Sequence, residues 1–344
     1  MGALKDLTGD KIFLFDSGQG TFLESEGVNI TETKLWGSTP FIKENFFDKN
    51  HLSNDKQAII KMLNEFQVCD LISIPTYQLS YDIFLEVLNL KANDESLKQY
   101  KELLANIASF TREHSNDKLL VGSVGCYGAA IAEEFTGNYP KDLDFYKFFK
   151  PQLESFNELE DVDIIGFETV PNFNELKDIL SWGEDKLSKS FYISLSCKDA
   201  CELELRDGTP LKTIAKYIRG LYEENKINKN LRLIGVNCCS FFSSLPSIKE
   251  LNKYLNDDKL RIPFIVYPNS GEIYDPVSKT WSEPEDKRHS SKENWVPAVK
   301  EYASNNCRVI GGCCRTTPDD LKCIREGIEP VSYTHLTLPT NYTV

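Results

Sequence analysis

The sequence predicts an α/β protein built as a single-domain (β/α)8 TIM barrel. Eight short runs rich in β-branched and aromatic residues recur along the chain, and segments with helical spacing of apolar residues lie between them. The sequence has no dinucleotide-type glycine loop and no linker rich in Pro, Gly or Ser. Eight strand–helix units in one chain are typical of a barrel, and a doubly wound α/β sheet is the alternative.

The predicted strands are nearly continuous in apolar residues, as LLVGSV, DIIGF, FYISL and RLIGV show. This pattern indicates parallel strands that helices cover on both faces. The strands are expected at 11–16, 70–75, 118–124, 162–168, 190–195, 231–236, 262–267 and 308–311. Helical segments are expected at 85–90 leading on to 103–110, and at 143–159, 174–187, 211–224, 247–255, 295–303 and 318–326.

The barrel domain is expected over residues 1–330, and a different kind of segment follows at 331–344. This tail, VSYTHLTLPTNYTV, is rich in Thr and contains no Asp, Glu, Lys or Arg. The charged helix before it is predicted to end near Glu329–Pro330. We interpret the tail as non-native sequence from a vector or an assembly, and a native β-rich tail is the alternative.

The charge balance disfavours two classes of partner. The 344 residues include 39 Lys and Arg against 52 Asp and Glu, a formal net charge of −13, which argues against nucleic acid or an anionic membrane surface. No apolar run reaches the roughly 18 residues of a membrane span, and the first eleven residues lack the apolar segment of a secretory signal. We therefore expect a cytoplasmic protein with small-molecule substrates, whose oligomeric state the sequence leaves open.

Two pairs of cysteines follow predicted strands where a barrel builds its active site. Cys238 and Cys239 close the sixth strand, and Cys313 and Cys314 close the eighth, directly after a Gly-Gly pair. Successive side chains on a strand point to opposite faces, so Cys313 and Cys314 can share one ion only if the chain leaves β geometry there. The two glycines supply that freedom.

Cys238, Cys313 and Cys314 are predicted to bind one Zn²⁺ per chain. Three thiolate ligands leave the fourth tetrahedral position open, as in catalytic sites, and the chain has no C-x2-C pair of the kind that closed sites use. Such an ion is suited to holding a substrate thiol as a thiolate, the chemistry of thiol alkylation. The alternative is that these are small buried core residues. Packing thiols are expected at Cys69, Cys126, Cys197, Cys201, Cys307 and Cys323, and Cys239 should point away from Cys238.

Eight short motifs, in order and spacing, resemble the homocysteine S-methyltransferase family from about Lys11 to Glu326. The resemblance is closest to its short, single-domain branch, which uses S-methylmethionine, with S-adenosylmethionine as a second donor. The motifs are DSGQGT at 16–21, PTYQ at 75–78, GSVG at 122–125, YGA at 127–129, FETVPN at 167–172, GVNC at 235–238, YPNSGE at 267–272 and GGCCR at 311–315.

The resemblance implies a (β/α)8 barrel, the three zinc ligands named above, and a set of substrate contacts. Asp16 and Glu168 would bind the amino group of homocysteine, the backbone amides around Gly18–Gly20 with Thr76 would hold its carboxylate, and Asn237 would also contact the substrate. Two positions depart from the family pattern. Ser17 stands where the family usually has Gly, and a serine at positive φ would be strained. Cys126 stands where the family often has Pro.

The implied reaction places the homocysteine sulfur as the fourth zinc ligand, from where its thiolate takes a methyl group from a sulfonium or ammonium donor to give methionine. Cobalamin-dependent relatives carry additional domains for folate and corrinoid, which we do not expect here because this sequence leaves no room for them after the barrel. S-methylmethionine or S-adenosylmethionine is therefore the expected donor, with betaine as the alternative. The donor cation could rest on Trp36, Tyr77 or Tyr127, for which packing is the alternative. The segment 271–292 is expected to be a lid over the donor.

Three other functions remain open from the residues alone. A zinc-dependent barrel hydrolase would use His and carboxylate ligands, but none of His51, His114, His289 and His335 lies at a predicted strand end. An iron–sulfur protein could use three cysteines and an open corner. A thiol-based redox or zinc-buffering protein is the non-enzymatic alternative.

Overall fold

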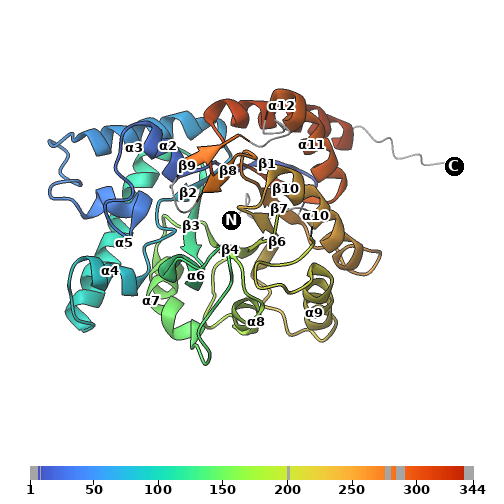
Figure 1. Cartoon of the computed structure of the whole chain (residues 1–344), viewed down its shortest axis with the longest axis horizontal. Helices are drawn as coiled ribbons and strands as arrows, with labels where there is room; N and C mark the ends of the chain where they lie inside the picture. Colours follow the sequence, from blue (N-terminus) through green and yellow to red (C-terminus); the bar gives the residue numbers. More distant parts are fainter. Residues whose placement is uncertain (1–6, 8, 200–201, 276–279, 284–290, 337–344) are drawn as a thin grey trace.

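Eight parallel strands form one sheet that curls into a barrel, and helices surround it (Figure 1). The computed structural model describes residues 7, 9–199, 202–275, 280–283 and 291–336. The predicted (β/α)8 fold is confirmed, and all eight predicted strands are present with ends shifted by at most two residues. They are β1 (Phe13–Leu14), β2 (Leu71–Ile74), β3 (Leu119–Gly125), β4 (Ile164–Val170), β5 (Phe191–Ser196), β6 (Leu231–Asn237), β7 (Phe264–Tyr267) and β10 (Cys307–Ile310).

The two edges of the sheet meet at β1 and β2. The strand order is β1-β10-β7-β6-β5-β4-β3-β2, and a parallel bridge between Phe15 and Leu71 joins the edges. The Asp70 N–H donates to the Leu14 carbonyl at 2.8 Å, and the Asp70 carboxylate accepts from the Leu14 N–H at 2.8 Å. The chain therefore returns to its starting strand, which places all eight C-terminal strand ends around one mouth.

The helices form at amphipathic segments that begin at polar capping residues such as Ser53, Ser80 and Asn93. The helical stretch predicted from 85 to 110 is divided, because Asn89 adopts a φ of +52° and Asn93 then starts a new helix with a capping box. The helices are α2 (Gln19–Ser25), η1 (Trp36–Ile42), α3 (Asn54–Glu65), η2 (Phe66–Val68), α4 (Tyr81–Val87), α5 (Asp94–Ser115), α6 (Tyr127–Ile131), α7 (Phe145–Glu158), α8 (Phe173–Ser181), α9 (Leu211–Glu223), α10 (Phe241–Leu255), α11 (Lys292–Ser304) and α12 (Pro318–Leu336).

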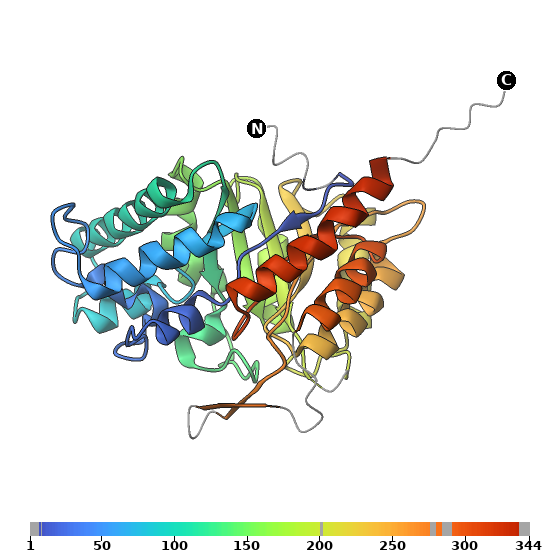
Figure 2. The same ribbon diagram turned by 90° about the horizontal axis from the view of Figure 1, so that it is seen from above.

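Other helices also differ from the sequence-based expectation, since α8 ends at Ser181 instead of near 187 and α10 begins at Phe241 instead of near 247. The helix α12 continues to Leu336 instead of ending near Glu329–Pro330, although a proline in a helix interior removes one hydrogen bond and crowds the preceding turn. The interpretation of 331–344 as non-native stays a prediction, and residues 337–344 lie outside the described part. The segment expected to be a lid contains the antiparallel strands β8 (Ile273–Asp275) and β9 (Thr280–Ser282), which project beyond one end of the barrel in Figure 2, and its role as a lid stays a prediction. Its residues 276–279 and 284–290 are outside the described residues.

The interior of the barrel changes from apolar to polar along the strands. An apolar layer includes Val121 and Tyr192, which are fully buried. Two residues further along the same strands, on the same face, stand the buried hydroxyl residues Ser123 and Ser194. This change supplies hydrogen-bonding groups at the C-terminal mouth, where the predicted site residues lie.

Candidate active site

Three cysteine thiols meet at the C-terminal mouth of the barrel. Cys238 follows β6, while Cys313 and Cys314 follow β10, and β7 lies between these two strands in the sheet. The three sulfur atoms lie within 4.8 Å of one another, and those of Cys238 and Cys314 are 4.0 Å apart. A tetrahedral ion with bonds of about 2.3 Å to sulfur separates its ligand sulfurs by about 3.8 Å. The thiols predicted as ligands are therefore close together and spaced to hold one metal ion.

The backbone leaves strand geometry at both cysteine segments, as predicted for the second. The strand β10 ends at Ile310, and Cys238 adopts a left-handed φ of +47°. The Cys313 N–H donates to the Pro268 carbonyl at 2.8 Å, and the Cys314 N–H donates to the Asn269 side-chain oxygen at 3.1 Å. These bonds from the loop after β7 fix both cysteines, so that their side chains reach one point.

The three thiols share hydrogen bonds. Donation from the Cys238 and Cys313 thiols holds the pKa of Cys314 well below its usual range. Hydrogen bonding to Cys313 and Cys314, followed by burial, raises the pKa of Cys238 well above its usual range. Cys313 and Cys314 are only half-buried. The cluster thus stabilises one thiolate, and a divalent cation that reaches it would displace the remaining protons.

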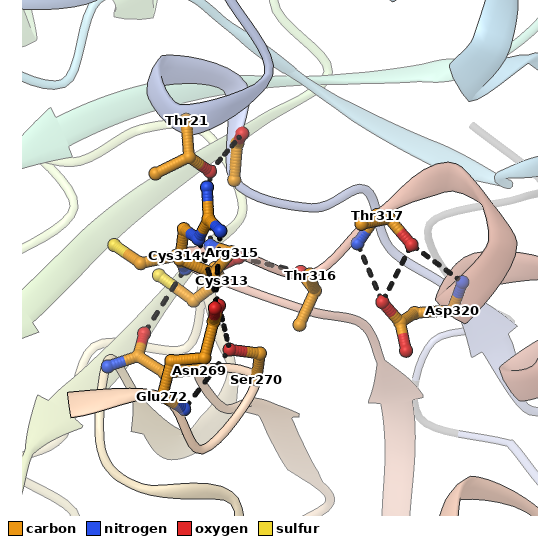
Figure 3. A network of polar contacts seen from close by, with 11 residues as sticks. Thr21, Asn269, Ser270, Glu272, Cys313, Cys314, Arg315, Thr316, Thr317 and Asp320 are labelled. Carbon is orange, nitrogen blue, oxygen red and sulfur yellow. Dashed lines mark hydrogen bonds and ion pairs between the residues drawn. The ribbon is translucent and has the colours of Figure 1, made fainter. Parts of the chain in front are cut away.

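A polar network beside the cluster ties α2 to the loops after β7 and β10 (Figure 3). The Arg315 guanidinium forms two bonds to Glu272, at 2.8 Å and 3.2 Å, and Ser270 donates to the same carboxylate at 3.0 Å. The backbone N–H of Arg315 donates to the Thr21 hydroxyl at 3.1 Å. Sequence reasoning assigned no role to Asn269, Glu272 or Arg315, although each lies inside a motif quoted above.

Asp16 and Glu168 are both buried in the mouth of the barrel. Asp16 accepts from the Ser73 N–H at 2.8 Å and from Gln19 at 3.0 Å, yet burial, with the Glu168 charge nearby, raises its pKa to about 7. Glu168 accepts from the Ser123 and Tyr192 hydroxyls, each at 2.6 Å, and burial raises its pKa. In the described part of the chain neither carboxylate pairs with Lys or Arg. Two buried acids that repel each other make a site suited to a cation.

The segment predicted to bind the substrate carboxylate packs against the cysteine loop. The Gly18 N–H donates to the Cys313 carbonyl at 3.1 Å, and a Cβ at Gly18 would lie 2.6 Å from that oxygen, so only glycine allows this approach. Gly20 lies in the first turn of α2, where backbone N–H groups have no helical partner. The Thr76 hydroxyl donates to the Ser123 carbonyl at 2.8 Å. Ser17 does not adopt positive φ, so the strain considered for it is absent, and its buried hydroxyl has no partner among the described residues.

Asn237 is engaged with protein partners. Its side-chain oxygen accepts from the Thr169 N–H at 2.9 Å and from the Ser194 hydroxyl at 2.8 Å, and its NH₂ group donates to the Thr169 hydroxyl at 2.8 Å. Thr169 has a φ of +62° and follows Glu168 directly. Asn237 therefore holds a strained residue beside the buried acid, and its predicted contact with substrate stays a prediction.

The remaining candidates do not belong to the thiol cluster. Cys239 and Cys197 are buried, and burial raises the pKa of both thiols. The pKa of Cys197 is raised to about 12. Trp36 is 40% exposed, and the Tyr127 ring packs edge-on against three aromatic rings. The other predicted packing thiols are buried at Cys69, Cys126 and Cys307 and half-buried at Cys323, whereas Cys201 and His289 are outside the described residues.

The shifted pKa of Asp16 leads to a pH prediction. The predicted contact of Asp16 with the ammonium of an amino acid requires the ionised carboxylate, so on that prediction lowering the pH through about 7 should weaken binding. We expect the dissociation constant of methionine, whose thioether does not titrate, to rise about tenfold between pH 8 and pH 6. Calorimetric titration at constant metal content measures this. Asp16→Asn should bind weakly with a flat profile, and an equally flat profile in the unmodified protein would contradict the assignment.

A parallel barrel with three convergent thiols and two buried carboxylates at its mouth defines a TIM-barrel enzyme with an open thiolate metal site. The sequence model of the family described as homocysteine S-methyltransferase matches residues 13–328. The chain belongs to the homocysteine S-methyltransferase family.

Relatives match nearly the whole chain. Homocysteine S-methyltransferase 1 of Saccharomyces cerevisiae is 43% identical over 94% of this chain and 95% of its own length. Homocysteine S-methyltransferase 2 of the same yeast is 41% identical over 93% and 94%. Among solved structures, the metallated form of the homocysteine methyltransferase MmuM from Escherichia coli superposes with a TM-score of 0.69 at 22% identity, covering 94% of this chain and 98% of that one, which supports the fold.

Within the described residues, no helix combines the length and the apolar character that crossing a bilayer requires.

Proposed function

We propose that this protein transfers a methyl group from S-methylmethionine, or from S-adenosylmethionine, to the thiol of homocysteine, giving methionine, and that Cys238, Cys313 and Cys314 hold one Zn²⁺. The observation that carries the proposal is the convergence of three thiols next to a buried pair of carboxylates. Two relatives named homocysteine S-methyltransferase, each more than 40% identical over nearly the whole chain, support the same reaction.

The thiol set fits zinc, since three sulfur ligands at this spacing leave a tetrahedral corner for a substrate. When bound, zinc lowers the pKa of a substrate thiol from its usual value of about 8.5 and keeps it ionised near neutral pH. The protein supplies the positioning. Asp16 and Glu168 accept hydrogen bonds from the amino group of homocysteine, and the first turn of α2 faces its carboxylate.

The chemical step balances without a general base at the methyl group. The homocysteine thiolate forms a new carbon–sulfur bond to the methyl carbon, the bond from that carbon to the donor sulfur breaks, and its electron pair stays on the donor as a neutral thioether. The thiol proton leaves to solvent. The negative charge of the thiolate and the positive charge of the sulfonium are both lost in this step. A site that excludes water therefore favours the reaction, because water stabilises the charged reactants more than the neutral products.

Betaine remains the second candidate donor within the same chemistry. A hydrolase is less well supported, because neither His51 in an exposed loop nor His114 in α5 belongs to the thiol cluster. Free thiols at the cluster also suit a reducing compartment such as the cytoplasm.

The test is methionine formation from homocysteine with each donor separately. We expect turnover with S-methylmethionine, weaker turnover with S-adenosylmethionine and little with betaine. One zinc and no acid-labile sulfide per chain are expected in the same preparation. Acid-labile sulfide, or no methionine from any donor, would overturn the proposal.

A further inference from the structure

Glu134 follows α6 in the loop after β3, at the mouth that holds the thiol cluster. Ala132 ends α6 with a left-handed φ of +59°, and the chain turns back, so that the Glu133 N–H donates to the Gly128 carbonyl at 2.8 Å. A Cβ at Gly128 would lie 2.8 Å from the Glu134 nitrogen. The backbone of Glu134 therefore packs directly onto the start of α6.

The Glu134 carboxylate has an unsatisfied oxygen. Its Oε2 atom is buried and has no hydrogen-bond partner in the described part of the protein, and no described Lys or Arg pairs with it. Burial raises the pKa of Glu134, and negative charge at Cys314 adds to the shift, which places this acid near the thiol cluster. A buried carboxylate oxygen without a partner costs stability, and a bound cation would remove that cost.

Tyr77, in the loop after β2, is within electrostatic reach of both Glu134 and the thiol cluster. The Gly125 N–H donates to the Tyr77 carbonyl at 3.0 Å, so the loops after β2 and β3 are joined at this point. Burial raises the pKa of the Tyr77 hydroxyl well above its usual range, and charges at Cys126, Glu134 and Cys238 contribute. One aromatic side chain thus senses the charge of Glu134 and that of a thiol of the cluster.

We propose that Glu134 binds the cationic group of the methyl donor beside Tyr77, and so selects positively charged donors. This inference rests on the proposed function. Asp16 and Glu168 account for the amino group of homocysteine, whereas the donor brings its own positive charge to the mouth and needs a separate counterion. A carboxylate next to an aromatic ring is a favourable setting for a sulfonium or an ammonium group.

The substitution Glu134→Gln tests the inference, with Glu133→Gln as the matched control. Glu133 is the adjacent half-buried acid, and its carboxylate already accepts from the Thr136 hydroxyl. For Glu134→Gln we expect the KM for S-methylmethionine to rise about 30-fold or more, while the KM for homocysteine and the zinc content stay unchanged. Glu133→Gln should match the unmodified protein, and Glu134→Asp, which keeps the charge, should fall between. An unchanged donor KM in Glu134→Gln overturns the inference.

Equilibrium binding separates this inference from the proposed function and identifies the cationic group. Calorimetry with the zinc-loaded protein would measure S-methylmethionine, which carries a sulfonium and an ammonium, and the trimethylsulfonium ion, which carries the sulfonium alone. If Glu134→Gln loses affinity for both ligands, Glu134 binds the sulfonium group. If it loses affinity for S-methylmethionine alone, Glu134 binds the ammonium group. Equal affinities of both proteins for S-methylmethionine refute the role of Glu134. Absence of turnover in the unmodified protein refutes the proposed function instead.

Discussion

Replacing Cys313 by Ala should remove bound zinc and methyl transfer together. The variant leaves two thiols where three converge, and a thiol with a pKa of about 8.5 is only about 3% ionised at pH 7. Loss of thiol activation therefore costs about 30-fold, and loss of positioning adds to it, so we expect turnover to fall by at least about 100-fold. Metal analysis and initial rates of methionine formation measure both effects.

Cys239→Ala is the matched control for this variant. Cys239 is also a buried thiol and is adjacent to Cys238, but it does not belong to the cluster. Its replacement should lower stability by about 1 kcal/mol and leave the zinc content unchanged. Full activity in Cys313→Ala, or equal loss of zinc in both variants, would contradict the ligand assignment.

Replacing Glu168 by Gln should raise the KM for homocysteine by about two orders of magnitude while zinc stays bound. The buried carboxylate accepts from Ser123 and Tyr192 and is proposed to bind the substrate ammonium. Removing one charge of such a pair costs about 2–5 kcal/mol, because the ammonium is left buried without its partner. Asp16→Asn should act in the same direction. Steady-state kinetics with homocysteine varied at saturating donor measures the change.

Glu175→Gln controls for the loss of any buried acid. Glu175 is fully buried and has a pKa raised to about 7 by burial, like Asp16, but it accepts from the Tyr127 N–H and the Tyr139 hydroxyl instead of facing the mouth. Its replacement should lower the melting temperature and leave the KM for homocysteine unchanged. An unchanged KM in Glu168→Gln would show that Glu168 does not bind the amino acid.

The strands could be predicted because parallel strands buried on both faces are apolar along their whole length. Short, continuous apolar runs such as 190–195 therefore indicate strands of this kind. The thiol cluster was predictable for a related reason, since the fold brings strand ends together and Cys238, Cys313 and Cys314 all follow strands. The divided helix at Asn89 depends on one left-handed residue, which helical spacing does not reveal.

The sequence could not indicate which loop residues meet. Asn269 supports Cys314 from 45 positions away, and Arg315 bonds Glu272 across 43 positions. Glu134 carried no signal of its own, since a single acid in a polar loop is ordinarily solvated. Its buried, unpartnered oxygen is visible only once α6 and the turn after it are in place.

X-ray absorption at the zinc edge tests the central claim most directly, because it counts the sulfur atoms bound to the metal. The purified protein should show three sulfur ligands and one oxygen or nitrogen ligand. Addition of homocysteine should raise the count to four sulfurs, and addition of its oxygen analogue homoserine should leave it at three. A sulfur count that does not change with homocysteine, or a protein that binds no zinc, would contradict the account.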